Sequence, residues 1–171
     1  LSAQIQQMSI DMGMGTDAIA EIAAQGGQLG IPIEKLGEFT KMAGEMSVAF
    51  GMTAEDAGDA AAKIANVFGL PIEEVGKLGD AINTLGNTSA AKESEIVDVM
   101  QRIGGQAKQF GLATEQAAAL SAAFISLGKS PEVAGTAINA LLTKLQTANV
   151  QSDDFKEALA GIGLNADKMA D

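Results

Sequence analysis

Apolar residues recur along the chain at helical spacing. One set, with steps of three and four positions, comprises Leu36, Phe39, Ala43, Met46 and Phe50. Such steps place the whole set on one side of a helix. Similar stripes cover residues 57–68, 72–85, 96–110 and 133–145. Apolar and polar residues alternate strictly only in 8–14, where a frayed helix end or a loop is favoured over a short strand. The pattern therefore predicts an all-α fold.

Six short junctions separate these stripes. In each, a glycine follows an apolar residue, and after a short linker an acidic residue opens the next stripe. Glycine can adopt the left-handed conformation that ends a helix, and acidic residues are favoured in a first turn. The junction residues are Gly30 with Pro32, Gly51 with Thr53, Gly69 with Pro71, Gly111, Gly128 with Ser130 and Pro131, and Gly163. We expect Thr53, Ser130 and Asn165 to cap the following helices, and the three prolines to occupy first helical positions.

The junctions divide the chain into units of roughly 17 to 21 residues, one helix each, with further boundaries near 87–89 and 152–153. The prediction is an array of about eight short amphipathic helices, packed as a compact or gently extended bundle. A regular superhelix is not expected, because standard solenoid repeats of this kind contain two helices. Residues 1–15 are expected to be a helix end or flexible lead-in, 16–148 the helical core, and 149–171 a helical extension.

Composition excludes most kinds of catalytic site. The 171 residues include no cysteine and no histidine, which rules out thiol nucleophiles, imidazole bases and the common zinc sites. The net charge of −11 opposes sequence-independent binding to nucleic acid or to an anionic bilayer. No apolar run approaches the roughly 20 residues needed to cross a membrane. We expect no enzyme activity, no catalytic residue, no metal and no cofactor. Because the first residue is Leu1, a piece of a longer protein is expected.

Three weaker motifs have simpler explanations. Residues 128–130 read Gly-Lys-Ser but lack the earlier glycine and the strand of a phosphate-binding loop. Residues 13–18 fit Gly-x-Gly-x-x-Ala, yet no second strand follows, so a flexible loop ending in a Thr16 cap is favoured. The acidic pairs at 55–56, 73–74 and 153–154 fall in predicted first turns, where the helix dipole favours them. None of the three motifs indicates a catalytic or ligand-binding site.

Glycines also occur inside the predicted helices, where each costs about 1 kcal/mol relative to alanine. Examples are Gly37, Gly44, Gly58, Gly76 and Gly79. Close helix crossings within the chain are the favoured explanation, and contacts between copies of the chain are the alternative.

Several segments resemble tail tape measure proteins of tailed phages and prophages. They are residues 48–58 (VAFGMTAEDAG), 102–112 (RIGGQAKQFGL), 122–137 (AAFISLGKSPEVAGTA) and 141–145 (LLTKL). The resemblance covers roughly residues 25–148, and the 122–145 stretch is the most specific part. The family has no catalytic residues in this region that could be carried over.

The resemblance implies a structural virion protein that sets tail length during assembly and leaves the tail ahead of the genome. The implied partners are tail tube and tail-initiation (baseplate or tip) proteins, tail-assembly chaperones, and the host envelope at ejection. Self-association is the alternative that the glycines inside the helices leave open. The implied location is the tail lumen, and the host cytoplasm during assembly. The glycine breaks predict an array that folds back on itself when isolated. Because its core is built of small residues, which are cheap to expose, we hypothesise that the array opens inside the tube. The alternatives are a helical adaptor or chaperone-type binding module and, less favoured, a membrane-active helical domain.

Overall fold

The computed structural model describes residues 2–169, with side chains from residue 4 onward, and this part of the chain is helical without any strand. The helices are α1 (Ser2–Met12), α2 (Thr16–Gln28), α3 (Ile33–Phe50), α4 (Ala54–Phe68), α5 (Ile72–Thr88), α6 (Glu93–Phe110), α7 (Thr114–Ser126), α8 (Pro131–Gln146), the 3₁₀ turn η1 (Ala148–Val150), α9 (Asp153–Gly161) and α10 (Ala166–Met169). The predicted all-α class is confirmed. Eight helices precede residue 147, and the expected boundaries near 88 and 152 occur where α5 ends and α9 begins.

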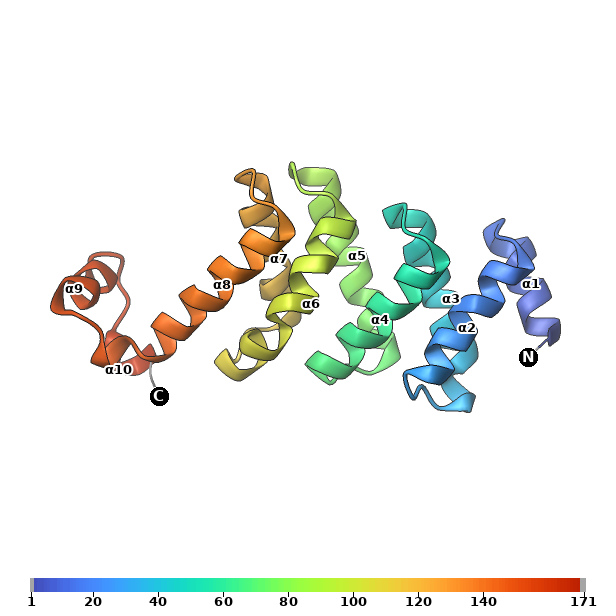
Figure 1. The fold of residues 1–171 in the computed structure, drawn as a ribbon, viewed down its shortest axis with the longest axis horizontal. Coiled ribbons are helices and arrows are strands. Elements are labelled where there is room, and N and C mark those ends of the chain that lie inside the picture. The colour runs from blue at the N-terminus through green and yellow to red at the C-terminus, as the bar shows by residue number, and fades with distance from the viewer. Residues whose placement is uncertain (1, 170–171) are drawn as a thin grey trace.

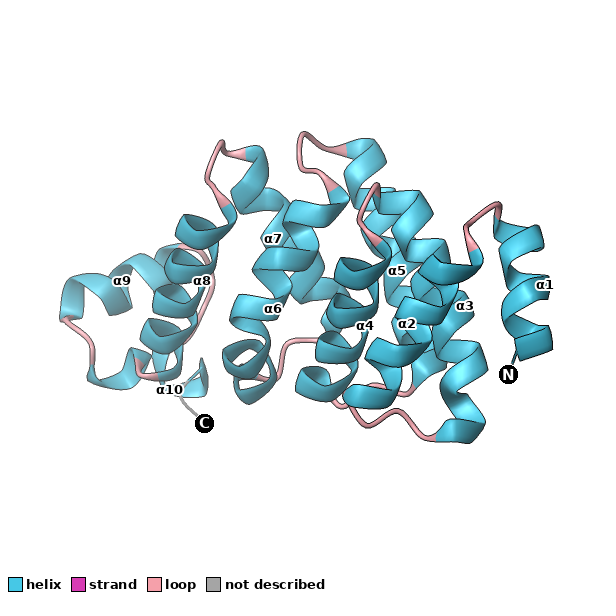
Figure 2. Ribbon diagram, turned by 45° about the vertical axis from the view of Figure 1, so that its right-hand side comes forward, coloured by secondary structure: helices cyan, strands magenta, loops and turns pink. Residues whose placement is uncertain are grey.

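Helices α1 to α8 form two layers that extend along one direction (Figure 1). The even-numbered helices α2, α4, α6 and α8 pack side by side in one layer, and α1, α3, α5 and α7 form the other. Each helix turns back on the one before it and contacts the helix two places along the chain. The turned view in Figure 2 shows the loops at the two edges of the array.

The packing unit is therefore a pair of helices, which replaces the expected one-helix unit. Gly30, Gly69 and Gly111 all stand between an even and an odd helix, about 40 residues apart. A stripe on one helix shows which side is buried but not which neighbour covers it. For this reason the alternation between layers could not be read from the spacing of the junctions alone.

A glycine lies at every contact between neighbouring even-numbered helices. A Cβ atom on Gly58 of α4 would lie 3.3 Å from the Cβ atom of Gln25 on α2. One on Gly104 of α6 would lie 2.5 Å from Cγ1 of Val67 on α4, and one on Gly135 of α8 would lie 3.0 Å from Cβ of Arg102 on α6. Any larger residue would push these helices apart, so the glycines set the spacing of this layer.

In the odd-numbered layer, the contact between α3 and α5 is looser. Cβ atoms on Gly76 and Gly79 of α5 would stand 3.7 and 3.6 Å from Met42 and Met46 of α3, which is ordinary van der Waals contact. Gly37 of α3 has only the Gln4 amide nearby, at 3.8 Å. The predicted close crossings are thus found at Gly58 and at Gly44, where a Cβ atom would lie 2.9 Å from Sδ of Met12 on α1, but not at these three glycines. Within the even layer the closest approaches are at Gly104 and Gly135, and between the layers a Cβ atom on Gly26 of α2 would lie 2.6 Å from Phe39 of α3.

The described part of the chain is helical at both of its ends. Residues 2–12 form α1, which packs on α2 and α3, and Met12 lies against Gly44 of α3. At the other end, α9 and α10 pack on each other and on η1, and they do not continue the odd layer beside α7. Figure 1 shows them beyond the lower end of α8.

Two adjacent glycines in α6 allow a direct test of the crossings. We expect Gly104→Ala to lower the free energy of unfolding by about 1–3 kcal/mol, because the added methyl group overlaps Val67. Gly105→Ala is the matched control: nothing lies within 4 Å of its position, and we expect it to raise stability by up to about 1 kcal/mol. Urea unfolding followed by circular dichroism measures both. Equal effects would show that the α4–α6 contact does not require glycine.

Candidate functional site

The sequence analysis identified the helix junctions as candidate structural sites. In the structure, the glycine of each of these six junctions has a left-handed backbone conformation. The φ angles are +86° at Gly30, +61° at Gly51, +70° at Gly69, +82° at Gly111, +76° at Gly128 and +80° at Gly163. At all six junctions, the amide that follows the glycine donates to a carbonyl near the end of the preceding helix: Ile31 to Gly26, Met52 to Ser47, Leu70 to Ala65, Leu112 to Ala107, Lys129 to Phe124, and Leu164 to Leu159. These bonds satisfy carbonyls that a helix end otherwise leaves free.

Side-chain caps occur at some of the expected positions. Thr53 Oγ1 accepts a hydrogen bond from the Asp56 amide at 3.1 Å, and Asn165 Oδ1 accepts from the Asp167 amide at 3.0 Å. Ser130 occupies the N-cap position of α8, but its side chain accepts no capping bond. Ser152, not expected as a cap, accepts from the Phe155 amide at the start of α9.

Two of the three prolines precede their helix instead of being its first residue, as was predicted. Pro131 is the first residue of α8, as expected, whereas Pro32 and Pro71 are the N-cap residues of α3 and α5. Their ψ angles of 144° and 156° are extended, so the helix starts at the following isoleucine in both cases. Similarly, Thr16 is the first residue of α2 and the N-cap position is Gly15, so the predicted Thr16 cap is wrong.

Two junctions differ from the predicted pattern. Gly13, between α1 and α2, also has a positive φ of +64° and was missed because the residues before it were interpreted as a frayed end or loop. The turn between α5 and α6, residues 89–92, contains neither glycine nor proline. No amide in this turn donates a hydrogen bond to a carbonyl of α5. The turn is held instead by burial of Ala91 and by a bond from the Ala91 amide to Ser89 Oγ.

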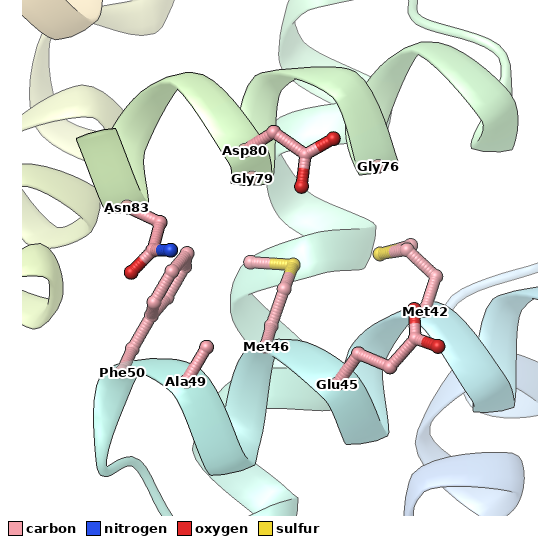
Figure 3. Close-up of a pocket in the computed structure, with 9 residues that line it drawn as sticks. All are labelled: Met42, Glu45, Met46, Ala49, Phe50, Gly76, Gly79, Asp80 and Asn83. Atoms are coloured by element: carbon pink, nitrogen blue, oxygen red, sulfur yellow. The ribbon is translucent and has the colours of Figure 1, made fainter. Parts of the chain in front are cut away.

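A narrow groove separates α3 from α5 on the outside of the odd layer (Figure 3). Met42 and Met46 point from α3 toward Gly76 and Gly79 of α5, and Asp80 lies at the rim. Its volume of about 80 Å³ is far below the 300–1,000 Å³ typical of small-molecule sites. We interpret it as a joint between helices rather than a ligand site.

Exposed charged pairs connect helices of the same layer. Lys35 of α3 bonds to Glu73 of α5, and this hydrogen bond is the main reason that the pKa of Glu73 is lowered. In the even layer, the Arg102 guanidinium lies 2.8 Å from Asp98 on its own helix and 3.3 Å from Glu132 on α8. Pairs this exposed contribute little stability and are weakened by salt.

Two hydrogen bonds between uncharged groups also join α6 to α8. Asn139 Nδ2 donates to the carbonyl of Arg102 at 3.2 Å, and Gln106 Nε2 donates to Gln146 Oε1 at 2.6 Å. These bonds fix the register of the two helices across the close approach at Gly135.

The three weaker motifs all lie at helix junctions. Residues 128–130 form the turn into α8, residues 13–18 form the turn into α2, and the acidic pairs lie in the first turns of α4, α5 and α9. Within residues 2–169 no cluster of three acidic side chains could hold a metal ion. Over the same range, no helix combines the length and apolar character that a membrane span requires.

The whole array, not just one segment of it, matches a known family. Residues 2–171 match the family of phage-related minor tail proteins. The chain belongs to this family. No curated protein and no solved structure has significant similarity to it. Membership in a phage-related minor tail protein family supports a structural role in the phage tail, and it agrees with an array whose recurring glycine turns serve to end helices.

The junction glycines of this minor tail protein can be tested with one matched pair. Gly51 has open space around its Cβ position, so Gly51→Ala introduces left-handed strain alone, and we expect a loss of about 1–2 kcal/mol. Gly27→Ala, inside α2 with equally open space, is the control, and we expect a gain of up to about 1 kcal/mol. Thermal unfolding measures both. A neutral Gly51→Ala variant would mean that the α3–α4 turn tolerates another conformation.

Proposed function

We propose that this chain is part of a tail tape measure protein and that its residues contribute to the length of the tail. The proposal rests on the match to phage-related minor tail proteins, on the resemblance at residues 48–58, 102–112 and 122–145, and on one feature of the fold. That feature is the linear order of the contacts: substantial contacts join only elements close together in the chain, mostly one or two places apart.

Linear order matters because a ruler must convert chain length into distance. In an array with only near-neighbour contacts, removal or addition of a helix pair leaves the remaining pairs intact. The same order lets the array open one pair at a time, without unthreading any part of the chain. A globular core with contacts between distant segments would have neither property.

The folded and opened forms differ greatly in length. In the folded array, a helix pair of about 40 residues adds one interhelical spacing, about 10 Å. The same residues in an end-to-end helix add about 60 Å, at 1.5 Å per residue. Tail length therefore reports which form the chain has when the tube is built around it.

An in-frame deletion of residues 70–111 measures this contribution. It removes α5 and α6 and joins Gly69 to Leu112, which restores a Gly-Leu turn followed by a helix with an early glutamate. The alternation of layers is kept, because α4 is then followed by α7. We expect tails to shorten uniformly by about 60 Å, measured by electron microscopy of many tails.

Other outcomes assign the role differently. A shortening of about 10 Å would mean that the array stays folded in the tail. Tails of unchanged length would contradict a ruler role for these residues. A duplication of residues 70–111 is the matched control, and we expect it to lengthen tails by the same amount. If both variants abolish tails, the segment acts in tail initiation instead.

A further inference from the structure

Exposed apolar side chains are concentrated at the two ends of the array. Ile10 and Ile33 lie at the α1–α3 end and are 76% and 75% exposed. Leu127 and Val133 lie at the α7–α8 end and are 72% and 53% exposed. Residues 51–126, which form the middle of the array, expose no large apolar side chain. Repeat arrays that end in solvent carry polar outer faces at their ends, so these apolar ends are suited to contact with another molecule.

The side of α8 that faces away from α6 is one of these apolar surfaces. Gly135 faces α6. The residues on the opposite side, about 120–180° around the helix from Gly135, are Val133, Ala137, Ala140, Leu141 and Lys144. This free side is more apolar than the side of α6 that α8 covers, which carries Arg102 and Gln106. Helices α9 and α10 lie beyond the lower end of α8 (Figure 1), and they leave Val133 and Ala140 exposed.

At the other end of the even layer, α2 has the small residues of a close crossing but no helix packed against them. Gln25 faces α4, and Ala20 lies about 140° away from it around the helix. Gly27 lies on the same side as Ala20, and nothing is found within 4 Å of its Cβ position. Both small residues are exposed. In α4, α6 and α8, the corresponding side is covered by the even helix before it, so α2 differs from them in having this side free.

Two of the three crossings in the even layer share one register, and this register predicts how the free sides of α2 and α8 fit each other. Gly58, the fifth residue of α4, meets the tenth residue of α2. Gly135, the fifth residue of α8, meets the tenth residue of α6. The same register places Ala20, the fifth residue of α2, on Ala140, the tenth residue of α8. Two alanines are small enough for helices to approach closely.

We propose that folded arrays stack end to end, with the free side of α2 in one copy packed on the free side of α8 in a second copy and Ala20 against Ala140. The even layer then continues from copy to copy. The charges are complementary, because the α8 side carries Lys144 whereas α2 has acidic residues and no basic one. Such a contact joins unlike surfaces and does not close on itself, so it produces an open row of copies. This inference concerns the folded protein and does not depend on the proposed function.

Cysteine cross-linking between two single variants tests which surfaces meet, and the natural chain contributes no background because it has no cysteine. Ala20→Cys and Ala140→Cys proteins are mixed, oxidised under mild conditions and analysed on non-reducing gels. The control mixture is Gln28→Cys with Thr143→Cys, and both of these exposed residues are the thirteenth of their helix. The thirteenth residue of α6, Gly105, has nothing within 4 Å of its Cβ position although α6 is covered on both sides. This position therefore stays outside the contact.

We expect the mixture of Ala20→Cys and Ala140→Cys to give at least about tenfold more disulfide-linked dimer than either variant alone or the control mixture, because a disulfide requires Cβ atoms about 4 Å apart. As much dimer from Ala140→Cys alone would show a symmetric contact between two α8 helices and would overturn the proposal. A mixture that gives no more dimer than the control mixture would overturn it as well.

Sedimentation over a range of protein concentrations provides a second test. We expect the average mass of the unmodified chain to rise above 17.4 kDa as concentration increases. Ala140→Arg introduces a charge into the contact and is expected to remain monomeric, whereas Thr143→Arg introduces the same charge outside it and is expected to associate normally. Circular dichroism checks that both variants fold. An unmodified chain that stays monomeric, or equal association of the two variants, would contradict the stacking, and neither result bears on tail length.

Discussion

The close approach of the even-numbered helices over glycine is the constraint on which the rest of the array depends. Gly58, Gly104 and Gly135 each remove the one atom that would hold neighbouring helices apart. Because large side chains are scarce in this chain, tight backbone contact replaces them as the source of packing. The spacing of the even layer is thereby fixed, and in the odd layer α3 and α5 meet in ordinary van der Waals contact beside a narrow groove.

The helices and turns could largely be predicted from the sequence, whereas the packing partners of each helix could not. Left-handed glycines such as Gly51 and Gly111 have a local cause, so the residues around each turn are enough to identify it. The same holds for the Thr53 cap. Pro32 and Pro71 were predicted to be first helical residues but are N-cap residues. Proline fits both positions, and only the backbone angles distinguish the two.

The glycines inside helices show the limit of local reasoning. Gly76 and Gly104 look alike in the sequence, since both lie beside an apolar stripe. Gly104 meets a branched side chain of α4, while Gly76 faces the flexible stem of a methionine across a groove. That difference depends on which helices become neighbours, which a stripe does not encode. The turn at 89–92 was located by its polar residues, but its weak attachment to α5 could be seen only from the hydrogen bonds of the folded chain.

The acidic first turns have a consequence for the array as a whole. The even helices begin at one edge and the odd helices at the other, and acidic residues open helices on both edges, as Glu55 does for α4 and Glu73 for α5. Negative charge is therefore spread along the entire length of the molecule instead of being gathered at one end. A body charged in this way behaves as a line of charge. It repels any polyanion laid alongside it, over a distance set by the screening length of about 8 Å in physiological salt.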